Sequence, residues 1–281
     1  MRIELTGRCP LRRRELRVEP VDRGRLVLDA RELTFACPLE LTAIVTLARS
    51  AGDRKTVLIT PRDGGVMSYL ERMNVLSLLP EGAVIDGELP FGDRKNLSDR
   101  LLEVVHLAGQ DEADDVVLRL GRMIRTHFSP ELRGLVFQAV GELIDNAISH
   151  GTGPLGAFAA AQFYTGRTSG RQGLEFAVCD TGVGVLTHLS RNVRHRDLDT
   201  AEAALLRALE KGATGTEEER GNGLADLWRV TRHGGVTRLV LRSGDAVASV
   251  VANRDERRCS GLTVETRVCG TWAWLRVTSP H

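Results

Sequence analysis

The chain has 281 residues, of which 42% are hydrophobic and 27% charged, and 38 basic and 37 acidic residues give a formal net charge of +1. The charge balance excludes nucleic-acid binding through bulk positive charge, and the hydrophobic content excludes a disordered chain. We expect two globular domains, because single cores rarely grow beyond roughly 250 residues.

Lysine usage excludes one kind of phosphate site, and cysteine usage indicates no further kind of site. None of the three lysines, Lys55, Lys95 and Lys211, has the glycine before it and the Ser or Thr after it that a Walker phosphate-binding loop requires. The five cysteines form no C-x-x-C pair, so the sequence indicates neither a disulfide framework nor a zinc site.

No apolar leader and no stretch of roughly 18 apolar residues is present, and we expect a cytoplasmic protein that does not enter a membrane.

The first 90 residues alternate between short apolar runs and segments with helical spacing. Strands are predicted over Arg25 to Asp29 and Thr56 to Thr60, and helices over Leu39 to Arg49 and Val66 to Leu78. This order predicts a small α/β sandwich with one sheet. Pro, Gly and charged residues between 80 and 98 mark a boundary with a second domain.

The strand ending at Asp29 and the helix after it resemble the STAS domains of bacterial anti-anti-sigma factors. The resemblance covers most of residues 1–85, within a domain that we place at 1–90. STAS domains carry a phosphorylatable Ser or Thr at the start of this helix, where this chain has Cys37 and Pro38. Proline suits a first helical turn but offers no hydroxyl. The resemblance therefore implies a partner-docking domain without the phosphorylation switch.

The second part of the chain predicts helices and a strand-rich C-terminal end. The expected helices are Asp111 to His127, Ser129 to His150, Thr200 to Lys211 and Leu224 to Arg232. The expected strands are Leu174 to Cys179, Thr237 to Arg242, Ala246 to Ala252, Leu262 to Val268 and Thr271 to Val277. We expect an α/β sandwich over residues 98–278 with a mixed, largely antiparallel sheet.

One polar stripe stands out on the second of these helices. Glu142, Asn146 and His150 follow one another at intervals of four residues, so they share a face beside the apolar one. An Asn carbonyl oxygen suits Mg²⁺, and a Glu one turn earlier could deprotonate a nucleophile beside that metal. Taken alone, such a stripe is more often a solvated helix face.

A second motif follows the strand that ends in Cys179. Asp180 comes first, and Gly182 and Gly184 follow at alternate positions. Glycine lets the backbone approach a ligand, while the carboxylate accepts a hydrogen bond from an amino group such as that of adenine. The alternatives are an ordinary tight turn and a calcium-like loop that lacks its other ligands.

A third motif is the loop with Gly221 and Gly223 that opens the helix at Leu224. Free N–H groups and the helix dipole make such a terminus a phosphate site. A glycine loop of this kind is by itself a weak signal, because ordinary helix starts look the same.

The order and spacing of the motifs resemble the GHKL (Bergerat-type) ATP-binding domain of type II topoisomerases, heat-shock chaperones, mismatch-repair ATPases, histidine kinases and anti-sigma serine kinases. Residues 142–151 resemble the N box, D-T-G-V-G at 180–184 the G1 box, G-N-G-L at 221–224 the G2 box, and Gly270-Thr271 the closing G-T. The resemblance spans about residues 98–278. It implies a two-layer fold that binds ATP and Mg²⁺.

Carried over residue by residue, the resemblance implies that Asn146 holds Mg²⁺, that Glu142 is the base or orienting carboxylate, and that Asp180 binds the adenine amino group. The other implied nucleotide contacts are Gly182, Gly184, Gly221, Gly223, Leu224 and Thr271, with Thr214, Arg220 and His150 as further candidates. An ATP lid is implied over about Leu186 to Arg220.

Features that the sequence lacks exclude several branches of the GHKL family. His106 and His127 are followed by Leu and Phe rather than the Glu of a histidine-kinase phosphoacceptor, and no lysine follows Lys211, as the clamp ATPases would need. The anti-sigma serine kinases remain, and their partners are STAS domains. Three functions stay open: a protein serine/threonine kinase, a slow ATPase, and a non-catalytic module whose protein binding is gated by nucleotide. The expected partner is a protein regulator or antagonist related to STAS or sigma factors, and analogy implies a homodimer.

Overall fold

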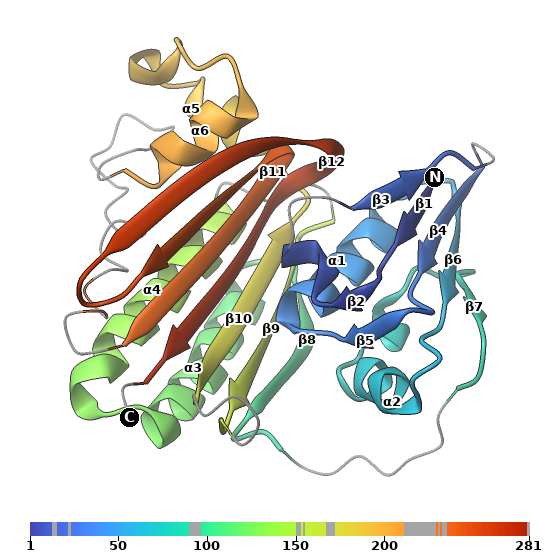
Figure 1. Ribbon diagram of the computed structural model, residues 1–281, viewed down its shortest axis with the longest axis horizontal. Helices are drawn as coiled ribbons and strands as arrows, with labels where there is room; N and C mark the ends of the chain where they lie inside the picture. Colours follow the sequence, from blue (N-terminus) through green and yellow to red (C-terminus); the bar gives the residue numbers. More distant parts are fainter. Residues whose placement is uncertain are drawn as a thin grey trace.

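The computed structural model describes residues 1–12, 16–21, 24–89, 97–149, 153, 155–166, 172–210, 229, 231 and 235–279. Two five-stranded sheets lie side by side with helices between and outside them (Figure 1), which confirms a mixed α/β fold. Among the described helices, none combines the length and the hydropathy that a membrane-spanning segment needs.

The first sheet has the strand order β3-β1-β4-β6-β7. Its strands are β1 (Arg2–Glu4), β3 (Arg17–Glu19), β4 (Arg25–Asp29), β6 (Lys55–Ile59) and β7 (Val84–Asp86). β3 is antiparallel to β1 and the other neighbours are parallel, so this sheet is mixed. Parallel neighbours need crossover connections, and α1 (Pro38–Arg49) and α2 (Gly64–Arg72) supply two of them.

A small parallel pair and two 3-10 turns complete the first part of the chain. They are β2 (Gly7–Arg8), β5 (Leu33–Phe35), η1 (Pro10–Arg12) and η2 (Leu76–Leu78). The single helix predicted over Val66 to Leu78 is wrong, because α2 ends at Arg72 and η2 is separate. Asn74 between them has φ of 62°, a left-handed conformation that a right-handed helix cannot include.

The second sheet has the strand order β11-β12-β10-β9-β8. Its strands are β8 (Leu101–Leu107), β9 (Ala157–Tyr164), β10 (Gly173–Asp180), β11 (Val236–Ala252) and β12 (Arg257–Thr278). Every pairing among these strands is antiparallel, so the mixed character expected for this sheet is found in the first sheet instead. The four short C-terminal strands predicted from the sequence are two long ones. Each continues through a shift in register near Ser243.

Two long helices cover one face of the second sheet (Figure 1). They are α3 (Gln110–His127) and α4 (Pro130–Ser149), close to the predicted bounds. Their buried side chains form one hydrophobic core with Leu174, Phe176 and Val178 of β10.

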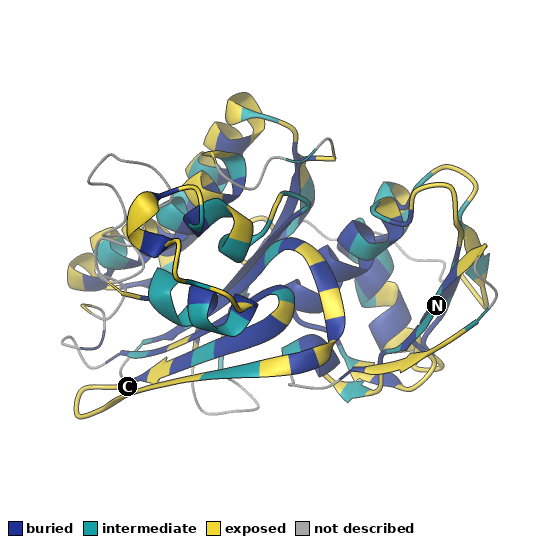
Figure 2. Cartoon of the chain, turned by 90° about the horizontal axis from the view of Figure 1, so that it is seen from above, coloured by how far each residue is buried: buried dark blue, intermediate teal, exposed yellow. Residues whose placement is uncertain are grey.

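α1 covers the opposite face of the second sheet. Ten of its twelve residues are buried, as expected of a helix enclosed between two layers. It contacts β9, β10 and β12, and Thr42 Oγ1 lies 3.2 Å from Cys179 Sγ of β10. Ala177, Cys179 and Trp274 of the second sheet belong to the same core as the first sheet, and Figure 2 shows buried residues continuing across this junction. We call this junction the seam.

The boundary predicted at 80–98 falls between β7 and β8, the last strand of one sheet and the first of the other. That the two parts are separate domains stays a prediction, since their side chains share a core at the seam.

We predict that Ile44→Ala in α1 lowers the free energy of unfolding by about 2 to 5 kcal/mol, because Ile44 is fully buried between the layers. Fluorescence of the buried Trp272 and Trp274 in the second sheet and far-ultraviolet circular dichroism should report one shared urea transition. The control Val18→Ala, at an exposed position of β3, should change stability by less than about 0.5 kcal/mol. Separate transitions for the two probes would contradict a shared core.

Candidate functional site

Asp180 is the last residue of β10 and is only 3% exposed. Its Oδ1 accepts hydrogen bonds from the backbone N–H groups of Gly182 (2.9 Å) and Thr271 (3.1 Å). Oδ2 has no hydrogen-bond partner among the residues that the structure describes. Asp180 therefore contacts Gly182 of its own motif and Thr271 of a separate motif, and its second oxygen remains available as an acceptor.

Gly270 makes the approach of Thr271 to Asp180 sterically possible. Its φ is +68°, and a Cβ built on it would lie 2.5 Å from Asp180 Oδ1 and 2.1 Å from the main-chain oxygen of Asp180. No side chain fits at such a separation. The glycine of the G-T pair is thus required by the packing of the carboxylate, as well as by its backbone conformation.

Ser243 joins the two glycine segments and is not among the site residues predicted from the sequence. Its Oγ donates a hydrogen bond to the carbonyl of Gly270 (2.8 Å) and accepts one from the N–H of Val185 (3.0 Å). Val185 begins α5 (Val185–Leu189), directly after Gly184, whose φ is +80°. The available signal was a Ser-Gly pair interrupting the apolar pattern of the predicted strands, where β11 shifts register.

The connection between α4 and β9 also lies against the Asp180 segment. Thr181 donates to the carbonyl of Gly156 from both Oγ1 (3.0 Å) and N (3.3 Å). A Cβ on Gly153 would meet the main-chain oxygen of Thr181 at 2.4 Å. Ser149, the end of α4, is four residues before Gly153, a span of at most about 14 Å. The C-terminal end of α4 therefore lies at the same end of the sheet as Asp180.

Alternation along β10 places Asp180 on the α4 side of the sheet. Phe176 and Val178 pack in the core under α3 and α4, whereas Ala177 and Cys179 pack in the core at the seam. Successive side chains of a strand point to opposite faces. Asp180 therefore shares its face with Phe176, Val178 and α4.

Glu142 and Asn146 lie one turn apart in the last part of α4. Glu142 is half-buried and Asn146 is exposed, while their neighbours Leu143 and Ala147 are buried against the sheet. An exposed carboxamide oxygen at this end of the sheet fits Mg²⁺, which takes few protein ligands and completes its shell with water and phosphate oxygens. The donor set is therefore compatible with this metal.

The phosphate-binding half of the predicted site lies outside the described residues. It comprises His150, Thr214, Arg220, Gly221, Gly223 and Leu224, together with most of the helix predicted from Leu224 to Arg232. The roles assigned to these residues stay predictions.

The segment expected to form a lid is folded over its described part. It contains α5, η3 (Val193–His195) and α6 (Ala201–Ala208). Thr200 caps α6, its side chain accepting a hydrogen bond from Ala203 N at 3.1 Å. Ala201 and Leu205 pack in the core with β11. The described part of this segment is therefore packed against the second sheet.

Burial gives Asp180 an unusual affinity for its proton. Removal from water raises the pKa of its carboxyl to about 7, although the two N–H bonds from Gly182 and Thr271 act in the opposite direction. A ligand that donates a hydrogen bond to the carboxylate would favour the charged form. Groups with such displaced pKa values are concentrated in functional sites.

Comparison with known proteins adds no family to this geometry. No protein-family model and no curated protein sequence matches the chain. The site is therefore described by what its own residues do: Asp180, Gly182, Gly184 and Thr271 form one connected cluster, and Glu142 and Asn146 lie on the helix that ends beside it.

We predict that Gly270→Ala destabilises the protein by about 3 kcal/mol or more, because its Cβ would displace Asp180 and break buried hydrogen bonds. The matched control is Gly82→Ala, with a similar φ of +79° and no atom within 4 Å of the added Cβ. It should cost only about 1 kcal/mol of backbone strain. Equal losses in chemical denaturation of the two variants would contradict the steric role of Gly270.

The raised pKa of Asp180 predicts that the stability of the protein depends on pH. Because its pKa is higher in the folded chain than in the unfolded one, its stabilising contribution is complete below about pH 4 and is lost as the pH rises through about 7. The free energy of unfolding of the wild type, relative to Asp180→Asn, should fall by about 3 kcal/mol between about pH 5 and about pH 8. Urea titrations at both pH values measure this, and a parallel pH profile for the two proteins would show that the carboxyl titrates normally.

Proposed function

We propose that this chain binds ATP and Mg²⁺ beside the end of β10 and is a GHKL-type protein serine/threonine kinase or ATP-gated regulator of bacterial partner switching, with a STAS-like first unit. The observation that carries the proposal is the Asp180 carboxylate. Oδ1 is held by two backbone N–H groups, and Oδ2 has no partner among the described residues, so a ligand's amino group can donate to it.

The amino group of adenine suits this carboxylate. A buried acceptor of fixed orientation discriminates strongly between a ligand that donates a hydrogen bond and one that cannot. Thr271 lies beside it, as the adenine-binding Thr of the family does. Gly182 and Gly184 keep the backbone beside Asp180 free of side chains.

Asn146 and Glu142 would act at the phosphate end of the nucleotide. Asn146 would hold Mg²⁺, which when bound neutralises charge on the phosphates. Glu142, one turn earlier, would accept a proton from a serine or threonine hydroxyl of the substrate and orient its oxygen. Most of the acceleration would come from positioning the two reactants.

One contact supports the non-catalytic alternative, in which ATP controls protein binding without turnover. Thr42 of α1 touches Cys179, the residue before Asp180. A nucleotide that shifts the end of β10 would alter the seam, and so alter how the STAS-like unit is held. This unit would then act on the ATP-binding part of its own chain.

We predict that Asp180→Asn weakens ATP binding at least about tenfold in calorimetric titration. Because position 180 must offer its oxygen to Gly182 and Thr271, the Asn NH₂ would take the place of Oδ2 and face the adenine amino group. The same change should improve binding of ITP, whose 6-oxo group accepts a hydrogen bond. The control Asp99→Asn changes an exposed carboxylate and should bind ATP normally. Unchanged preference for ATP over ITP in Asp180→Asn would refute the adenine assignment.

Incubation with γ-labelled ATP distinguishes the remaining activities. Label on a protein indicates a kinase, and labelled free phosphate indicates an ATPase. Intact ATP in the presence of demonstrated binding favours the gated module. Either activity should be lost in Glu142→Gln, and Asn146→Ala should remove the dependence of ATP affinity on Mg²⁺.

A further inference from the structure

Two cysteines and a glutamate meet at the seam, away from the candidate site. Cys9 precedes η1, Cys37 is the N-cap residue of α1, and Glu40 lies in the first turn of that helix. All three are buried, and their sulfur and carboxylate oxygen atoms lie within 4.8 Å of one another. We call them the thiol cluster.

Backbone hydrogen bonds fix the members of the thiol cluster. Glu40 Oε1 accepts from Leu11 N (3.0 Å) and Oε2 accepts from Cys37 N (2.9 Å), which leaves each oxygen a further lone pair. Cys9 is held by the hydrogen bond from its N–H to the carbonyl of Phe35 (3.0 Å). Metal ligands in proteins are commonly oriented in this way by hydrogen bonds from a second layer of groups.

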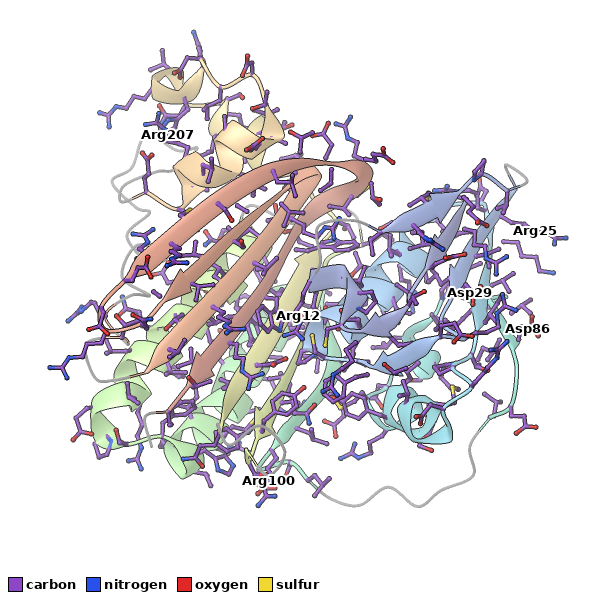
Figure 3. All side chains as sticks on the ribbon, in the orientation of Figure 1. Arg12, Arg25, Asp29, Asp86, Arg100 and Arg207 are labelled. Carbon is purple, nitrogen blue, oxygen red and sulfur yellow. The ribbon has the colours of Figure 1, made fainter. Side chains whose placement is uncertain are left out.

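The charges around the cluster favour a cation of charge two. Two thiolates and a carboxylate carry three negative charges. Burial without a cation disfavours these charges, because removal from water raises the pKa of Cys37 and of Glu40. Two arginines lie nearby: Arg12 reaches over the ring of Trp274 toward Glu175 of β10, and Arg242 donates a hydrogen bond to the carbonyl of Leu11. Figure 3 shows Arg12 at the seam with sulfur atoms beside it. A divalent ion would offset two of the three negative charges of the cluster.

We propose that Cys9, Cys37 and Glu40 bind one Zn²⁺ ion at the seam. Thiolate ligands select thiophilic metals over Mg²⁺ and Ca²⁺, and the carboxylate oxygen favours Zn²⁺ over Cu⁺. Three protein ligands leave a fourth position for water, as in other three-ligand zinc sites. Binding displaces the two thiol protons into solvent, and no oxidation is involved.

Zinc at this position would link two segments of the chain. It would join η1, which carries Arg12, to the N-terminus of α1, and both of these elements contact the second sheet. The ion would therefore strengthen the seam itself. This inference is independent of the proposed ATP binding, because it uses none of the residues of that site.

The test uses the full chain without nucleotide, after treatment with a chelator, titrated with Zn²⁺ against a chromophoric indicator and separately with Co²⁺. We expect one equivalent to bind, with release of two protons and a thiolate-to-Co²⁺ charge-transfer band in the near ultraviolet. Cys9→Ser and Cys37→Ser should each lower the affinity at least about tenfold. Serine at position 37 remains a good N-cap, so that variant should fold.

Cys259→Ser is the matched control, since Cys259 is an exposed thiol outside the cluster, and it should bind both metals as the wild type does. X-ray absorption at the zinc edge of the loaded wild type needs no variant, and should show two sulfur neighbours at about 2.3 Å. The proposal fails if no metal binds, if the bound zinc has no sulfur neighbours, or if Cys37→Ser leaves the affinity unchanged.

Discussion

The burial of α1 between two sheets is the constraint on which the rest of this structure depends. A helix with ten of its twelve residues buried cannot remain at a surface, so the first sheet and the second sheet must both pack against it. This packing leaves α3 and α4 to cover only the other face of the second sheet. The polar contacts at the seam, such as Arg12 over Trp274, add specificity to what is mainly an apolar junction.

The candidate site depends on the burial of the second sheet, as the fold depends on the burial of α1. Asp180 is buried because β10 is covered on both faces along its whole length. A buried carboxylate must have hydrogen-bond partners, and here they come from two turns that glycine makes narrow enough to reach it. Ser243 then fixes these turns relative to each other. The rigidity of the cluster is therefore a consequence of burying one charge.

The sequence predicted the elements whose apolar residues follow a clear period, and the motifs that are contiguous. α1, α3 and α4 were predicted for the first reason, and Asp180 with Gly182 for the second. β9 was missed because it is rich in alanine and buried on both faces, so it shows neither alternation nor strong strand propensity. Ser243 and the thiol cluster depend on pairings between distant strands, which no local pattern records.

β10 has a different neighbour on each face, and this restricts how its sequence can change. Cys179 faces the helix of the first unit and Asp180 faces α4. Inserting or deleting a single residue within the strand would exchange the two faces. The carboxylate would then enter the apolar seam, and the thiol would enter the candidate site. Related proteins should therefore differ in the length of the turns that flank β10, while the strand itself keeps its length.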